Sequence, residues 1–265
     1  MKTILIYDGS FDGFLTAVYQ VFQEKLDNVQ ILKPKHYEPD MFSTCQEIIT
    51  DIKKSKRVWK SLIVKASKTG ANELHRTFLS EIKGVEALLL RYIIYVYSTE
   101  TFSHNNYSNN DVLRVSQIAR MVGREKHRME AFVRFQLTKD GIYFSSVEPD
   151  FNVLPLIARH FKDRYADQLW IIYDFKRNYG LYYDLTSVER ITFEHTLDAE
   201  AITNNTSLFD ENEMAYKDLW LNYFESTNIK SRKNMKLHLR HIPRRYWKYL
   251  SEKRNQNMIP SKGFN

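Results

Sequence analysis

The chain has 265 residues, a formal net charge of +7, 43% hydrophobic residues and 27% charged residues. These proportions are typical of a globular protein and exclude a wholly disordered or collagen-like chain. The single cysteine, Cys45, excludes an internal disulfide, an all-cysteine zinc site and a cysteine-held iron–sulfur cluster within one chain.

The opening of the sequence becomes polar by Asp8, which is too soon for a signal peptide. The most apolar stretch, residues 85–97, carries Glu86 and Arg91 and is too short to span a bilayer. We therefore expect a cytoplasmic protein with no membrane partner.

The N-terminal residues predict a strand, a helix and a second strand. Residues 4–7 and 29–32 are short apolar runs, and Ser10 is placed to cap a helix that reaches about Lys25. This order favours a parallel pair of strands. Residues 35–45 show no periodic pattern and predict a loop.

The middle of the chain has helical spacing from about residue 50 to residue 98, with breaks expected at Gly70 and Gly84. Its last part, residues 85–97, is apolar nearly all round and predicts a buried central helix. After a polar loop, Asp111 is the expected cap of a further helix that runs to about Arg128.

The second half of the sequence has strand composition. Helices are expected at 154–165 and 211–226, a polar linker at 195–210, and a last helix at Pro243. The expected strands cover residues 131–137, 142–147, 169–173, 181–185 and 188–193. The fold class is therefore α+β: a short N-terminal strand–helix–strand unit, a helical middle, and a β-rich mixed sheet with helices in the second half.

The positive charge is concentrated at the C-terminus. Residues 229–265 contain eleven basic residues and one acidic residue, a net charge of +10, so the remainder sums to −3. Basic groups neutralise phosphates, and interleaved aromatic rings can stack on bases. The candidate nucleic-acid-binding residues are Arg232, Lys233, Lys236, Arg240, Arg244, Arg245 and Lys248. The alternative is a solvated basic face on helices that Trp247 and Leu250 anchor in the core, or one paired with the acidic stretch 198–218. We expect Trp247 to be a core residue.

Four residues are candidates for metal binding or acid–base catalysis: His127, Glu130, Glu148 and His160. No known ligand spacing such as H-E-x-x-H accompanies them, so structural hydrogen bonding is the alternative and no metal is predicted. The segment Asp8–Gly13 could hold phosphate or Mg²⁺, but it lacks a phosphate-loop motif and is best interpreted as a tight turn.

Six ordered sequence blocks together resemble the bacterial "probable DNA metabolism protein" family, which contains a domain of unknown function. The resemblance covers nearly the whole chain. The blocks are YDGSFDGF at 7–14, HRMEAFVRF at 127–135, EPDFNVLPLIARHF at 148–161, RYADQ at 164–168, WIIYD at 170–174 and PRRYWK at 243–248.

The resemblance implies a role in bacterial DNA repair or modification with a radical-SAM partner protein, and some relatives are fused to a uracil-DNA glycosylase-like region. It also implies a core domain at 85–251, between an N-terminal region at 1–84 and a polar tail at 252–265. We expect a DNA-associated accessory protein without a cofactor of its own. The alternatives are a DNA-acting hydrolase with a His/carboxylate site and a non-catalytic interaction scaffold.

Overall fold

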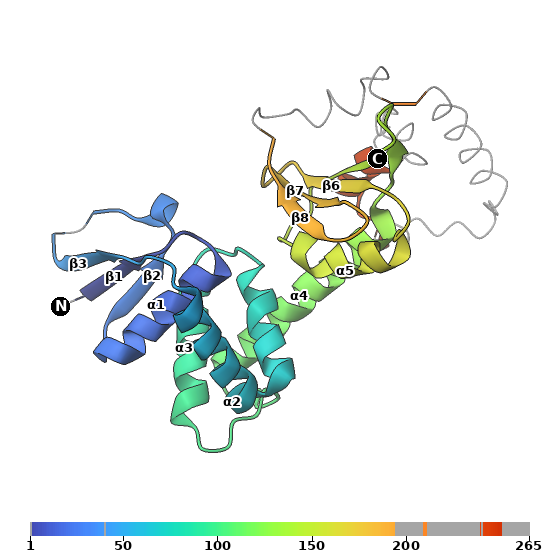
Figure 1. Ribbon diagram of the computed structural model, residues 1–265. Helices are drawn as coiled ribbons and strands as arrows, with labels where there is room; N and C mark the ends of the chain where they lie inside the picture. The colour runs from blue at the N-terminus through green and yellow to red at the C-terminus, as the bar shows by residue number, and fades with distance from the viewer. Residues whose placement is uncertain (1, 40, 194–208, 211–238, 240, 251–265) are drawn as a thin grey trace, which may run out of the picture. The chain divides into compact units, whose positions relative to one another are not determined.

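The computed structural model describes residues 2–39, 41–193, 209–210, 239 and 241–250 (Figure 1). The chain divides into two compact units, residues 1–123 and 124–265, and the boundary falls within helix α4 (Asn110–Phe132). The predicted helix at 211–226, the predicted tail at 252–265 and most of the predicted linker lie outside the described residues.

The first unit opens with a three-stranded parallel sheet in the order β2-β1-β3. Helix α1 (Phe11–Glu24) connects β1 to β2, and the Ser10 hydroxyl caps it by accepting a hydrogen bond from the Gly13 amide. The predicted strand–helix–strand unit is therefore confirmed. The strands are β1 (Lys2–Ile6), β2 (Val29–Leu32) and β3 (Ser43–Glu47), and a 3₁₀ turn, η1 (Pro34–His36), follows β2.

Strand β3 shows that the predicted loop at 35–45 was wrong over its last residues. The strand reads Ser-Thr-Cys-Gln-Glu and is mostly exposed at the edge of the sheet, where Cys45 pairs with Ile4 of β1. Backbone hydrogen bonds hold an edge strand of this kind, so its side chains need no apolar alternation that sequence reading could detect.

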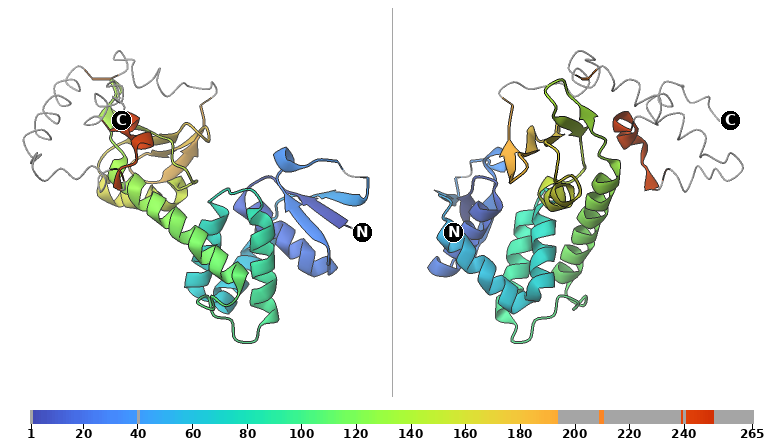
Figure 2. Two further views of the ribbon diagram at one scale, coloured as in Figure 1. Left: turned by 180° about the vertical axis from the view of Figure 1, so that it is seen from behind. Right: turned by 45° about the vertical axis from the view of Figure 1, so that its right-hand side comes forward.

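Helices α2, α3 and α4 follow the sheet along the chain. Helices α2 (Ile52–Phe78) and α3 (Val85–Ser98) pack against each other within the first unit, as the two views of Figure 2 show. Helix α3 is the predicted buried helix, and the hydroxyl of Tyr7 in the core donates a 2.9 Å hydrogen bond to its Glu86. None of the helices among the described residues is long and apolar enough to cross a membrane.

Helix α2 bends at Ser67, which has a φ of 67°, and not at Gly70 as expected. Gly70 is helical, and a Cβ there would lie 3.1 Å from the Tyr92 hydroxyl oxygen of α3. The glycine therefore permits close packing of the two helices instead of interrupting one of them.

Helix α4 differs from its prediction at both ends. Its N-terminal amides, those of Asp111 and Val112, donate to the Asn109 side chain, so the predicted cap at Asp111 was wrong; Asp111 pairs with Arg91 instead. At its C-terminus the helix continues to Phe132, into the predicted strand at 131–137. Strand structure there is limited to β4 (Gln136–Leu137).

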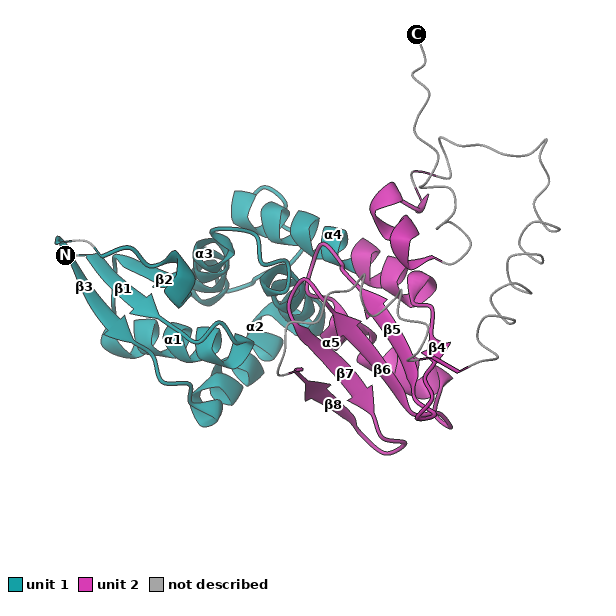
Figure 3. Cartoon of the chain, turned by 90° about the horizontal axis from the view of Figure 1, so that it is seen from above, with its two compact units in different colours: residues 1–123 teal, residues 124–265 magenta. Residues whose placement is uncertain are grey.

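The second unit contains a five-stranded mixed sheet in the order β4-β5-β6-β7-β8 (Figure 3). Among the strands of this unit that the structure describes, only β5 and β6 pair in parallel, and helix α5 (Leu154–Arg164) connects them. This arrangement confirms the predicted α+β class. The further strands are β5 (Tyr143–Val147), β6 (Trp170–Asp174), β7 (Tyr179–Tyr183) and β8 (Val188–Ile191).

Two features of this unit differ from the predicted pattern. Strand β7 ends at Tyr183, before the predicted end at Leu185, which has a φ of 76°. The last helix is the 3₁₀ helix η4 (Arg244–Tyr249), in which Tyr246 and Trp247 are only 1% and 4% exposed. The prediction of Trp247 as a core residue is confirmed.

Gly180 of β7 provides a test of packing in this unit. A Cβ there would lie 2.8 Å from the Tyr173 ring and 2.9 Å from the Ile172 carbonyl oxygen. We expect Gly180→Ala to lower the free energy of unfolding by about 1–3 kcal/mol. Gly123→Ala in α4 is the control, and it should raise stability by about 0.5–1 kcal/mol because its Cβ has room and alanine favours helix. Chemical denaturation of both variants measures these changes, and similar stabilities would contradict the packing argument.

Candidate nucleic-acid interface

The loop between β5 and α5, residues 148–153, is where the polar contacts of the second unit concentrate. The Asp150 amide donates to Glu125 of α4 at 2.8 Å. The guanidinium of Arg177, from the β6–β7 turn, donates to the Pro149 and Asp150 carbonyl oxygens, both at 3.1 Å. The Tyr179 hydroxyl donates to the Asn152 side chain. Three separate elements therefore hold this loop.

Glu125 is the buried carboxylate that α4 contributes to this network, with its side chain 1% exposed. Besides the Asp150 amide, it accepts a hydrogen bond from the Tyr246 hydroxyl of η4. The guanidinium groups of Arg128 and Arg245 lie 3.4 and 4.0 Å from it. A carboxylate without water needs such hydrogen bonds and opposite charges, and these partners supply both.

Tyr246 is suited to its role as a donor. Burial, together with the hydrogen bond to the Glu125 carboxylate, raises the pKa of its hydroxyl above the ordinary value. The phenol therefore stays protonated at neutral pH. Its ring also packs against Phe132, with 5.5 Å between centroids, so η4 lies against the C-terminal part of α4.

Asp174 and Arg177 form a second buried ion pair, 2.8 Å apart, at the end of β6. Burial raises the pKa of Asp174, while Arg177 and the backbone amides of the turn act in the opposite direction. The Asp174 carboxylate also accepts from the Lys176 and Arg177 amides, at 3.0 and 3.3 Å. This pair fixes the turn from which Arg177 reaches the loop at 148–153.

The described basic candidates lie on η4, and two of them contact carboxylates of this loop. Arg245 lies 2.5 Å from Asp150, and Lys248 lies 2.6 Å from Glu148. Both basic side chains remain about half-exposed, at 45% and 43%. Arg244 is exposed, and its guanidinium lies 5.9 Å from the Trp247 ring centroid. Arg232, Lys233, Lys236 and Arg240 lie outside the described residues.

The structure brings three of the four candidate catalytic residues together. The Nδ1 atoms of His127 and His160 each lie 3.9 Å from a carboxylate oxygen of Glu130. The Lys126 Nζ atom lies 2.5 Å from Oε1 of the same carboxylate. Glu148 is separate and pairs with Lys248. No group of three or more possible metal ligands occurs within the described part of the chain. The cluster brings Glu130 of α4 near His160 of α5, and at 3.9 Å neither imidazole is within hydrogen-bond distance of the carboxylate.

In the first unit, residues 8–10 turn the chain from β1 into α1, and residues 11–13 are already the start of that helix. The Asp8 carboxylate accepts hydrogen bonds from the Ser10 amide, the Ser10 hydroxyl and the Thr50 hydroxyl, at 2.7–2.8 Å. Although partial burial acts against it, these hydrogen bonds lower the pKa of Asp8. Both oxygens of this carboxylate therefore accept hydrogen bonds within the fold, Oδ1 from Ser10 of the turn and Oδ2 from Thr50.

Sequence reasoning missed two residues that organise this interface, Glu125 and Arg177, whereas Asp150, Asp174 and Tyr246 lie in the blocks at 148–161, 170–174 and 243–248. Glu125 resembles any charged residue of a long helix. The sequence offers one signal for its burial. Val122 lies three residues before Glu125 and Met129 four residues after it, and this helical spacing places Glu125 on the same buried face of α4.

Comparison with known proteins gives one family match. A profile described as "Domain of unknown function (DUF4130)" matches residues 83–252. A search of curated proteins gave no significant match to the sequence. Among solved structures, a pGpG-specific phosphodiesterase, PggH, from Vibrio cholerae is 11% identical, and the match covers 69% of this chain and 81% of that chain with a TM-score of 0.33. A likeness of this size supports no argument about fold or function.

The Tyr246–Glu125 hydrogen bond can be tested by removing one hydroxyl group. We expect Tyr246→Phe to lower the free energy of unfolding by about 1–3 kcal/mol, because a buried carboxylate loses a donor. Tyr143→Phe is the control, since its hydroxyl makes no hydrogen bond with any described residue, and it should change stability by less than about 0.5 kcal/mol. Urea denaturation gives the free energy of unfolding of both variants. Equal changes would show that the Tyr246–Glu125 hydrogen bond does not stabilise the protein.

Proposed function

The chain belongs to the DUF4130 family, whose matched region ends within the basic C-terminal segment, and we propose that it is a DNA-associated accessory protein. In this proposal the segment around η4 binds phosphate groups of the nucleic acid. The protein acts in bacterial DNA repair or modification, in the cytoplasm, and contributes binding rather than chemistry.

The observation that carries the proposal is the way η4 is attached. Tyr246 and Trp247 are buried, whereas Arg244, Arg245 and Lys248 of the same short helix are exposed. The helix thus anchors a segment with a net charge of +10 to the second unit while its own basic groups face solvent. That charge density exceeds what solubility requires, and it suits a polyanionic partner.

The ion pairs of Arg245 and Lys248 with Asp150 and Glu148 are compatible with phosphate binding. Exposed ion pairs contribute only about 0–1 kcal/mol, so exchanging a carboxylate for a phosphate costs little. In the absence of DNA, these carboxylates keep the basic side chains oriented. The proposal therefore predicts a site that exchanges one anionic partner for another.

A radical-SAM protein is the proposed protein partner. The support is the sequence resemblance, and two of its six blocks meet at the loop, where Arg245 and Lys248 of residues 243–248 pair with Asp150 and Glu148 of residues 148–161. Since this chain has one cysteine, any cluster for radical chemistry would belong to the partner.

Co-purification of the two proteins tests the proposed partnership. Association without any DNA affinity would instead favour an interaction scaffold.

DNA binding can be tested with a triple variant, Arg244→Gln, Arg245→Gln and Lys248→Gln. We expect the wild type to bind duplex DNA with an affinity that falls steeply as salt rises. In the triple variant the slope of log affinity against log salt should be smaller by up to about 3, because each lost phosphate contact removes roughly 0.9. Fluorescence anisotropy with a labelled duplex over a potassium chloride series gives both slopes.

A matched control removes the same charge elsewhere on the second unit: Lys139→Gln, Arg159→Gln and Arg164→Gln, all exposed in the wild type. This control should keep the wild-type salt slope. Absent or salt-insensitive binding by the wild type, or an equal loss in both variants, would rule out the anchored basic segment as the DNA-binding element.

A further inference from the structure

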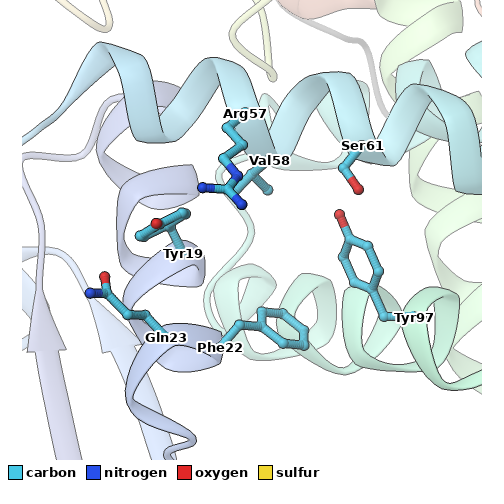
Figure 4. Close-up of a pocket in the computed structure, with 7 residues that line it drawn as sticks. All are labelled: Tyr19, Phe22, Gln23, Arg57, Val58, Ser61 and Tyr97. Atoms are coloured by element: carbon cyan, nitrogen blue, oxygen red, sulfur yellow. The ribbon is translucent and has the colours of Figure 1, made fainter.

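The first unit contains a pocket of about 360 Å³ between α1, α2 and α3 that the proposed function does not use (Figure 4). This volume lies within the range of about 300–1,000 Å³ found for small-molecule sites. Its lining residues are Tyr19, Phe22, Gln23, Arg57, Val58, Ser61 and Tyr97. All of them belong to one compact unit, so the pocket does not depend on the second unit.

Aromatic rings form much of the pocket wall. Phe22 is 43% exposed although its side chain is large and apolar. Its ring packs edge-on against the Tyr97 ring, with 5.2 Å between the ring centroids. Tyr19 adds a third ring from the same face of α1 as Phe22. Exposed aromatic faces in a hollow are favourable platforms for a planar ring system, since stacking requires no particular pattern of hydrogen bonds.

Polar groups of the pocket wall are available for a ligand. The Tyr97 and Ser61 hydroxyls point toward each other across the hollow in Figure 4, and the Gln23 amide lies at its edge. Within the described part of the chain, none of these three side chains makes a hydrogen bond. Together they offer both donors and acceptors to a ring that carries polar edges.

The charge beside the pocket favours an anion. Between Asp51 and Glu73 the chain has seven basic residues and no acidic residue, and this stretch forms most of α2. The Arg57 guanidinium lies 5.8 Å from the Tyr19 ring centroid, and the Lys54 ammonium lies 5.3 Å from the same ring. These cations are therefore placed at the mouth of an aromatic pocket.

We propose that this pocket binds a nucleotide unit, with the base among Tyr19, Phe22 and Tyr97 and the phosphate on the basic side chains of α2 that flank it. The pocket wall offers aromatic rings, polar groups and positive charge. A planar ring with polar edges that is joined to an anion matches all three. The nucleotide can belong to a single-stranded nucleic acid or can be free, and the chemistry is the same. The inference goes beyond the proposed function because it requires neither η4 nor duplex DNA.

The test measures binding of a fluorescein-labelled oligothymidylate by anisotropy and of free thymidine monophosphate by calorimetry. We expect Phe22→Ala and Arg57→Gln each to weaken binding about tenfold, the loss typical of one base-stacking or charge contact. Ile94→Ala on α3, 44% exposed in the wild type, and Lys83→Gln, exposed between α2 and α3, are the matched controls and should bind within about twofold of the wild type. Circular dichroism checks that every variant is folded.

The outcomes separate the two nucleotide sources and the two proposals. A pocket-dependent loss for both probes supports a free-nucleotide site, and a loss for the oligonucleotide alone supports a single-strand site. Duplex binding should be unchanged in the pocket variants, so failure of the η4 proposal leaves this test intact. Wild-type binding by Phe22→Ala and Arg57→Gln, equal losses in Lys83→Gln, or no binding of either probe would overturn the inference.

Discussion

A carboxylate that is removed from water must be compensated by hydrogen bonds or opposite charge, and in the second unit this requirement falls on Glu125. Its partners come from a neighbouring turn of α4, from the loop after β5 and from η4. Because one buried group needs all of them, it connects segments that are more than a hundred residues apart in the sequence. The position of η4, and with it the anchoring of the basic C-terminal segment, depends on this interaction.

The same requirement recurs elsewhere in the chain with different partners. Glu86 is compensated by the Tyr7 hydroxyl and Asp174 by Arg177. In each case the buried or half-buried carboxylate serves the fold. The groups that we propose for ligand binding are exposed cations and aromatic rings, on η4 in one unit and on α1, α2 and α3 in the other. Such groups suit binding of a polyanion more than catalysis.

The candidate residues illustrate what spacing can and cannot predict. His127 and Glu130 are three residues apart on α4, so helical geometry alone brings them together. His160 joins them only because α5 lies against α4, and Glu148 does not join them because Lys248 holds it elsewhere. Charge density identified the basic residues of η4, yet it gave no indication that Asp150 and Glu148 would be their partners.

The amino-acid sequence by itself determined the features that arise from local periodicity and composition: the strand–helix–strand opening, the buried helix α3, the mixed sheet of the second half and the excess of cations near the C-terminus. Tertiary structure decided the edge strand β3, the end of α4, the partners of Glu125 and the pocket at Phe22. The physical reason is that these features depend on long-range partners. An edge strand is held by another strand's backbone, a buried charge by groups from distant segments, and a pocket by the faces of three helices that no sequence window contains together.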